Sequence, residues 1–344
     1  MTTLPRPRGP ISATLFSALQ DAPGSLGEVE VVAPADALTD DDLHLALYCA
    51  YELHYRGWDG VDERWEWDPG LLTLRARLEA CFEVALVAEL GPVDGPPVDH
   101  REMDLALRAV GEADESPSLS QHLARTGTRE QFEELVLHRS AYQLKEADPH
   151  TWAIPRLTGG PKAALVEIQA DEYGGGRPER LHSKLFADTM QALGLDATYG
   201  AALERLPGAT LATVNLTSML GLHRRLRGAL VGHLALYEIG SAVPSRRYAD
   251  GLRRLGLDDP QALEFYLEHV AADAVHEAVA AVDLAGGLAR DEPALGAQVL
   301  WGARALVLVD GAMARQIWAA WESGVCSLRA PAAEPALAGS GARR

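Results

Sequence analysis

The chain has 344 residues, of which 47% are apolar and 23% charged, and its formal net charge is −18 at pH 7. This length and composition are those of a soluble globular protein with one large core or two smaller ones. The negative charge disfavours nucleic acids and membranes as partners, because both attract clustered lysine and arginine side chains. Three widely spaced cysteines without a CxxC motif, and an N-terminus without an apolar signal segment, favour a cytoplasmic location.

The first part of the chain is predicted to form two segments. Residues 1–25 are rich in Pro, Gly and Ser and are predicted to be loosely ordered, and residues 26–127 are predicted to form an N-terminal helical segment. Within it, the sequence GEVEVVA at 27–33 resembles a short strand. Residues 52–69 hold three tryptophans and several acids. This mixture is typical of an aromatic joint between helices, with a lid over a substrate pocket as the alternative interpretation.

A catalytic helical bundle is predicted for residues 128–325. It follows a break at 111–127, where Pro, Ser and Gly gather. Alanine and leucine are abundant while aromatic residues make up only 6% of the chain, which favours helices over strands. Neither βα alternation nor an internal repeat is present. The tail at 326–344 is predicted to be disordered.

Two helices of this bundle have clear sequence signals. The helix predicted at 128–145 begins with a capping box, in which Thr128 and Gln131 each satisfy a backbone N–H of the other. A second helix is predicted from about 259 to 284, because Asp-Pro supplies an N-cap and a first-turn proline. The glycine run at 174–176 lacks the GK[ST] of a phosphate loop and is predicted to break a helix.

The second of these helices carries a cluster of metal-binding side chains. His269, Asp273 and His276 lie at positions i, i+4 and i+7, so they project from one face of a helix. The neighbouring residues are small or apolar, which indicates that this helix is largely buried. Two imidazoles and a carboxylate on one face can bind iron, manganese or zinc.

Further candidate ligands precede this helix. Glu179 lies three residues before His182, a spacing that lets two side chains share one metal. Glu238 lies in an apolar helix that Pro244 is expected to end, and an acid there costs free energy unless it is paired or bound to a metal. The remaining candidates are acids near the glycine run and at the end of the helix at 128–145: Glu167, Asp171, Glu172 and Glu146.

The order and spacing of these residues resemble a known family. The pattern is a Glu shortly before a His, a Glu from a middle helix, then His-x3-Asp-x2-His on a late helix. It resembles the haem-oxygenase-like di-iron oxidases and oxygenases, a family of iron-containing redox enzymes. The resemblance covers about 128–285, and the stretches ELHYRG and WEWDP upstream are typical of one bacterial branch.

The resemblance implies an all-α fold, namely a haem-oxygenase-like helical bundle with an additional N-terminal helical segment. It implies a centre of two iron ions, or of manganese and iron, with these ligands: Glu172, His182, Glu238, His269, Asp273 and His276. Glu146 and Glu179 are candidate additional ligands. Such a centre would activate dioxygen, with an electron donor as partner, in a monomer or a homodimer. The substrate would be a small amine, amino acid or fatty-acid-like molecule, changed by N-oxygenation, C–C cleavage or desaturation.

Four alternatives use the same fold. A haem oxygenase would bind haem through one histidine, whereas three histidines clustered with acids suit free metal ions better. A thiaminase-like enzyme needs a catalytic cysteine, and the cysteines lie outside the motif region. A cofactor-free oxidase would keep its activity after chelation. A non-catalytic metal-binding or partner protein would consume no oxygen. The two copies of Glu-x-x-His typical of ferritin-like bundles are not found, since only the pair Glu179 and His182 has that spacing.

Overall fold

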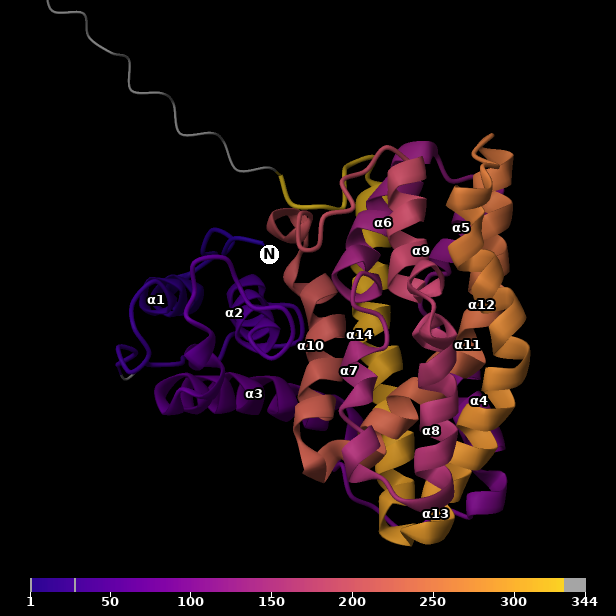
Figure 1. Ribbon diagram of the computed structural model, residues 1–344, viewed down its shortest axis with the longest axis horizontal. Helices are drawn as coiled ribbons and strands as arrows, with labels where there is room; N and C mark the ends of the chain where they lie inside the picture. Colours follow the sequence, from indigo (N-terminus) through magenta and orange to yellow (C-terminus); the bar gives the residue numbers. More distant parts are fainter. Residues whose placement is uncertain (1, 28, 331–344) are drawn as a thin grey trace, which may run out of the picture.

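The computed structural model describes residues 2–27 and 29–330, apart from the side chains of 273–275. All regular secondary structure in these residues is helical, which confirms the all-α prediction. The long helices of the main bundle run side by side (Figure 1). They are α6 (Arg129–Gln143), α8 (Gly159–Glu172), α9 (His182–Ala192), α10 (Gly208–Leu222), α11 (Arg227–Arg254), α12 (Pro260–Ala278) and α14 (Gly296–Glu322).

Helix α11 lies at the centre of the bundle, because it packs against α12, α14 and α5. Shorter helices complete the bundle: α4 (Met103–Glu112), α5 (Leu119–Arg125), α7 (Asp148–Thr151), α13 (Gly287–Asp291) and the π-helix at Val279–Gly286. Helices α4 and α5 fall within the predicted N-terminal segment, yet they pack against α11 and α14. The bundle therefore begins earlier in the chain than residue 128.

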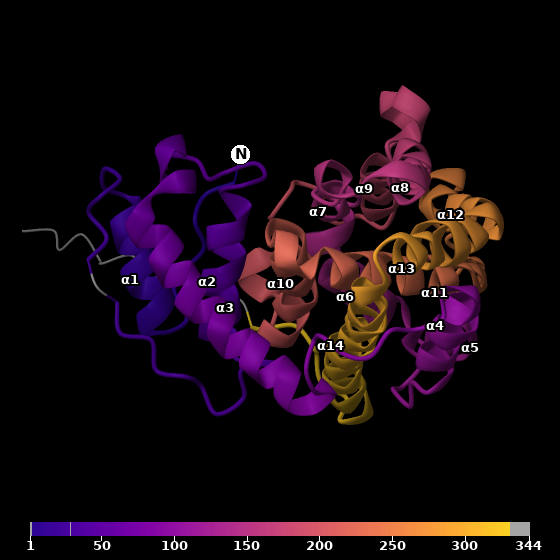
Figure 2. The ribbon, with the colours of Figure 1, turned by 90° about the horizontal axis from the view of Figure 1, so that it is seen from below.

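A lateral unit of three helices lies beside α10, and both views show it to one side of the bundle (Figures 1 and 2). It consists of α1 (Pro10–Leu19), α2 (Asp41–Glu52) and α3 (Pro69–Leu90), and α2 packs against α10. Residues 1–25 were expected to be loosely ordered, but α1 is a packed helix. Its first N–H groups, those of Ile11 and Ser12, each donate at 2.9 Å to the carboxylate of Asp42. Because this cap comes from another helix, it could not be predicted from the residues next to α1.

Two other expectations about irregular segments are corrected. The described residues of 27–33 form no strand, and no strand is found elsewhere in the described part of the chain with which they could pair. The beginning of the predicted disordered tail is also ordered. Ser327 and Leu328 are buried, and the Arg329 N–H donates to the Arg205 carbonyl at 2.8 Å. The rest of that tail, 331–344, lies outside the described residues.

The predicted helix signals are found in the bundle. Thr128 is the N-cap of α6, and its capping box with Gln131 is present. The helix predicted at 259–284 is α12, which continues into the π-helix Val279–Gly286.

Proline 244 does not end its helix, contrary to expectation, since α11 continues to Arg254. A proline inside a helix removes one hydrogen bond and crowds the carbonyl of the residue four positions earlier, here Gly240. Both residues line a cavity. The proline ring and the carbonyl that loses its bond therefore meet open space rather than packed side chains.

The segment 293–322, which contains α14, is long and apolar enough to cross a membrane, with a mean hydropathy of 1.2 over its most apolar window. However, 56% of that window is buried within the protein. It packs against α10 and α11. Such burial is typical of the core helix of a helical bundle.

Three buried histidines predict acid sensitivity of the fold. Burial lowers the pKa of His44 and His233 to about 4 and that of His138 to about 3. In the unfolded chain each would titrate near 6.5. As the pH falls from 6.5 towards 4, the unfolded state binds protons that the folded state does not. Each histidine should then lower the free energy of unfolding by about 1.4 kcal/mol per pH unit. Urea unfolding at pH 7, 5.5 and 4.5 measures this, and a His44→Gln protein should show a shallower pH dependence. Equal stability at all three values would contradict it.

Candidate metal centre

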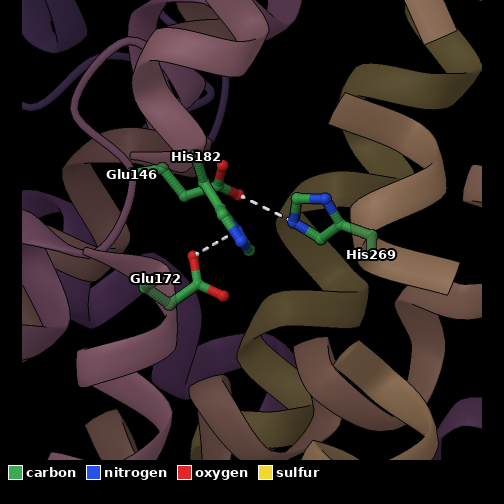
Figure 3. A group of neighbouring side chains, drawn as sticks. All are labelled: Glu146, Glu172, His182 and His269. Carbon is green, nitrogen blue, oxygen red and sulfur yellow. Dashed lines mark ion pairs between the residues drawn. The ribbon is translucent and has the colours of Figure 1, made fainter. Parts of the chain in front are cut away.

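Two groups of side chains in the bundle have the geometry of metal ligands. The first ligand group is Glu146, Glu172, His182 and His269, and the second ligand group is Glu172, Glu238 and His276. In each group one ligand atom per residue lies within 4.8 Å of every other, and all these residues are buried. Both groups contain Glu172. Figure 3 shows the first group, with its side chains converging from α8, α9, α12 and the turn after α6.

A link between α8 and α9 that folds back on itself, so that Gly174 lies against Arg180, brings Glu172 and His182 together. Glu172 ends α8 and His182 begins α9, and the link between them contains three glycines with positive φ. A Cβ added to Gly174 would lie 2.6 Å from the carbonyl carbon of Arg180, so only glycine fits there. This link places His182 Nδ1 2.9 Å from Glu172 Oε2.

Glu179 lies outside both ligand groups. It is exposed in the short helix Pro178–Arg180, and a new helix begins at His182. The three-residue spacing aligns two side chains only within one continuous helix. The sequence left Glu146, Glu172 and Glu179 as alternative ligands. Glu146 and Glu172 both belong to the first ligand group.

His269 is oriented for binding through Nε2. Its Nδ1–H donates to the Phe265 carbonyl at 2.8 Å, one turn earlier in α12. Nε2 therefore points, without a proton in the neutral ring, towards Glu146 Oε1 at 3.7 Å. Burial alone would lower the pKa of His269, but the hydrogen bond and the charge of Glu146 raise it to about 10. In the metal-free protein this imidazole is thus protonated at neutral pH.

The second ligand group has the same design. His276 Nδ1 lies 3.4 Å from Glu238 Oε2, and His276 Nε2 lies 3.0 Å from Asp171 Oδ2. Burial alone would lower the pKa of His276, but Glu238 and Asp171 raise it to about 9. The role of Asp171 as the outer partner of His276 was not predicted, although it directly precedes Glu172 on α8. The predicted ligand Asp273 lies outside the described side chains.

Glu172 is ionised between these histidines. Burial alone would raise the pKa of its carboxyl group, but the charges of His182 and His269 lower it below the ordinary value. A buried carboxylate surrounded by imidazoles is able to bridge two cations.

A metal ion fits this donor set. Glu146 Oε2 is buried and has no hydrogen-bond partner in the part of the chain that the structure describes, while His182 Nδ1 and His276 Nδ1 face only carboxylate oxygens of their own ligand groups. Buried polar atoms are nearly always satisfied, so such a cluster needs an explanation. Mixed carboxylate and imidazole ligands suit iron, manganese or zinc.

A family model described as "Iron-containing redox enzyme" matches residues 133–311, which is over half of the chain. The chain belongs to this family. The matched region contains every residue of the two ligand groups. The predicted family and its haem-oxygenase-like all-α fold are therefore confirmed.

This member of the iron-containing redox enzymes also resembles a curated protein. The nitrosourea synthase of Streptomyces achromogenes subsp. streptozoticus is 27% identical over 172 residues. The matched part is 50% of this chain but only 36% of the nitrosourea synthase. The chain thus spans little more than a third of the length of that relative.

A cavity of about 360 Å³ adjoins the ligand groups in this family member. His269 lines its inner end, and Tyr237 lines both this cavity and the smaller space around Glu146 and Glu172. Much of the remaining wall is aromatic: Phe186, Tyr248, Phe265 and Tyr266.

One ion pair lies in the wall of this cavity, which also contains several serines and a second acid, Asp114. Arg139 Nη2 on α6 lies 3.1 Å from Asp310 Oδ2 on α14. Burial alone would lower the pKa of Arg139, but Asp310 raises it above its ordinary value, so the guanidinium stays charged. About a quarter of each side chain is accessible, 25% for Arg139 and 27% for Asp310. Since both line the cavity, a ligand inside it can reach both charges.

Proposed function

We propose that this protein is a dioxygen-activating oxidoreductase with a non-haem centre of two iron ions. The observation that carries the proposal is the carboxylate of Glu172, which is 8% exposed and common to both ligand groups. A shared carboxylate is what a pair of ions at bridging distance requires. Membership of the iron-containing redox enzyme family supports iron as the metal.

The side chains of the chain prepare this site for two cations. The Phe265 carbonyl and Asp171 fix the ring orientations of His269 and His276, which leaves one nitrogen of each ring for a metal. The acids Glu146, Glu172 and Glu238 supply negative charge that offsets the charge of the ions. When bound, iron supplies the electrons with which dioxygen is reduced.

The cavity next to His269 is the proposed substrate site. Amines, amino acids and fatty-acid-like molecules are the three substrate classes that the resemblance implies. The wall offers both a guanidinium and a carboxylate, Arg139 and Asp310. A fatty acid would leave Asp310 without its counter-charge, and a simple amine would do the same to Arg139. An amino acid can pair its carboxylate with Arg139 and its ammonium with Asp310, so we propose an amino acid.

An Arg139→Gln protein is expected to bind the substrate more weakly. Calorimetry under nitrogen, with iron-loaded protein, would compare L-amino acids, the corresponding amines and fatty acids of equal length. We expect binding of at least one amino acid, and a loss of roughly tenfold to hundredfold in affinity in the variant, because a charge-assisted hydrogen bond disappears. Binding of only amines or only fatty acids would contradict this substrate class.

The oxidase function itself is tested without a substrate. The wild-type protein and a His269→Ala variant would be loaded with ferrous iron without oxygen and then mixed with oxygenated buffer. We expect the wild type to consume oxygen in proportion to its bound iron, and the variant to consume far less. Equal oxygen uptake in both proteins would reject the proposed centre. A wild type that binds iron but consumes no oxygen would favour a non-catalytic metal-binding protein.

A further inference from the structure

The turn that carries Glu146 is held in an unfavourable conformation. Residues 144–147 join α6 to α7, and Ala147 has φ 76° and ψ −37°. It is the only non-glycine residue with positive φ among those that the structure describes. Such a conformation is unfavourable for a residue with a Cβ, so surrounding contacts must hold it.

The lateral unit supplies contacts to this turn. Lys145 Nζ lies 2.9 Å from Glu52 Oε2 at the end of α2, and both side chains are 1% exposed. The Tyr199 hydroxyl lies 2.7 Å from both oxygens of Glu52 and shares its single proton with that carboxylate. The Arg56 guanidinium donates to the Leu144 carbonyl at 2.9 Å. Glu52 at the end of α2 thus contacts Lys145, and Arg56, which follows α2, contacts Leu144.

A purely structural contact would not need two buried charges. A buried ion pair contributes little net stability, and apolar residues of similar size often do as well or better. Here Lys145 lies against the rings of Tyr55 and Tyr48, with Nζ 4.2 Å and 4.8 Å from the ring centres. The ammonium is attracted to the faces of both rings, but that attraction alone would not require Glu52. An ion pair differs from apolar packing because its geometry is directional.

The contact also fixes a carboxylate that has few contacts of its own. Glu146 Oε2 has no hydrogen-bond partner among the described residues, and Oε1 lies 3.7 Å from His269 Nε2. The position of Glu146 therefore depends on its backbone. That backbone is fixed on one side by Lys145. On the other side, the Ala147 carbonyl accepts from the Gln169 amide at 3.4 Å.

We propose that the buried pair Glu52–Lys145 positions Glu146 as a metal ligand, so that the lateral unit is part of the machinery of the metal centre. This inference rests on the proposed function, since it takes Glu146 to bind iron. Glu52 and Lys145 are positioning residues, because neither belongs to a ligand group. Glu52 lies outside the residues that the family model matches. The pair therefore joins a residue outside the matched region to Lys145 inside it.

The test compares iron binding in three full-length proteins. Removing one partner would leave an unpaired buried charge and destabilise the fold. The test variant therefore removes both charges, as Glu52→Leu with Lys145→Met. The control is Glu79→Gln, a 4%-exposed acid of the same unit. Glu79 contacts Tyr51 at 2.9 Å, His223 at 2.8 Å and Arg75 at 3.3 Å, and none of these three partners belongs to the turn. Ferrous iron is titrated without oxygen, and thermal unfolding is recorded in parallel.

We expect the wild type and the Glu79→Gln control to bind two ions per chain. In the double variant one ion should bind about tenfold to hundredfold more weakly, which is the range found when the outer partners of metal ligands are removed. The affinity for the other ion should be unchanged. Two ions bound with wild-type affinity by a folded double variant would overturn the inference, and the pair would then only join the two units. Loss of one ion in the control as well would overturn it too. A wild type that binds no iron would instead reject the proposed function, and this inference with it.

Discussion

A Glu172→Gln protein is expected to lose both iron ions. The carboxylate of Glu172 belongs to both ligand groups, and its side chain is buried beside His182. An amide has almost the same size but no charge, so it cannot bridge two cations. We expect the apparent affinity for both ions to fall more than about 100-fold, beyond the range found for outer partners of ligands. Iron quantification after anaerobic loading and desalting measures this.

Two matched variants separate this effect from a general loss of acid side chains. Glu167→Gln changes an exposed acid of the same helix, α8, and Glu179→Gln changes the exposed acid just before His182. Both proteins should bind iron like the wild type. Glu238→Gln should weaken one ion only, because Glu238 belongs to the second ligand group alone. If Glu172→Gln also lost a single ion, Glu172 would not be the shared ligand.

Alanine at Gly232 or Gly302 is expected to destabilise the bundle severely. These two glycines lie where α11 and α14 cross. A Cβ on Gly232 would overlap the Val299 carbonyl oxygen, and a Cβ on Gly302 would overlap the Ala229 carbonyl oxygen. The backbone cannot rotate away from the added Cβ as a side chain could, so the two helices would have to move apart. We expect each substitution to lower the free energy of unfolding by about 3 kcal/mol or more. Urea unfolding of the metal-free proteins measures this.

A third glycine of α11 provides the control. A Cβ on Gly240 would meet no atom within 4 Å. Gly240→Ala should therefore raise the stability by about 0.5–1 kcal/mol, since alanine is the better helix former. A Gly232→Ala protein as stable as Gly240→Ala would show that α11 and α14 do not pack backbone against backbone.

The sequence predicts those parts of the fold whose causes are local. The capping box at Thr128 and the Asp-Pro start of α12 are local signals, and both helices are present. The order of α1 depends instead on Asp42, which lies about thirty residues further along the chain. The continuation of α11 past Pro244 likewise depends on a cavity formed by other helices. Sequence patterns describe neither cause.

The candidate site divides in the same way. His269 and His276 could be recognised from their spacing, because one helix presents them both. The choice among Glu146, Glu172 and Glu179 could not be made, since it depends on the link between α8 and α9 that folds back at Gly174. The role proposed for Glu52 could not be predicted from the sequence either. It depends on a contact 93 positions away in the chain.

Anomalous diffraction would show whether two iron ions share Glu172. Crystals of the full-length protein grown with ferrous iron under nitrogen would be measured on both sides of the iron absorption edge. We expect two iron peaks, one on either side of the Glu172 carboxylate. One should lie among Glu146, His182 and His269, and the other beside Glu238 and His276. A single peak, or peaks away from Glu172, in crystals saturated with iron would contradict it.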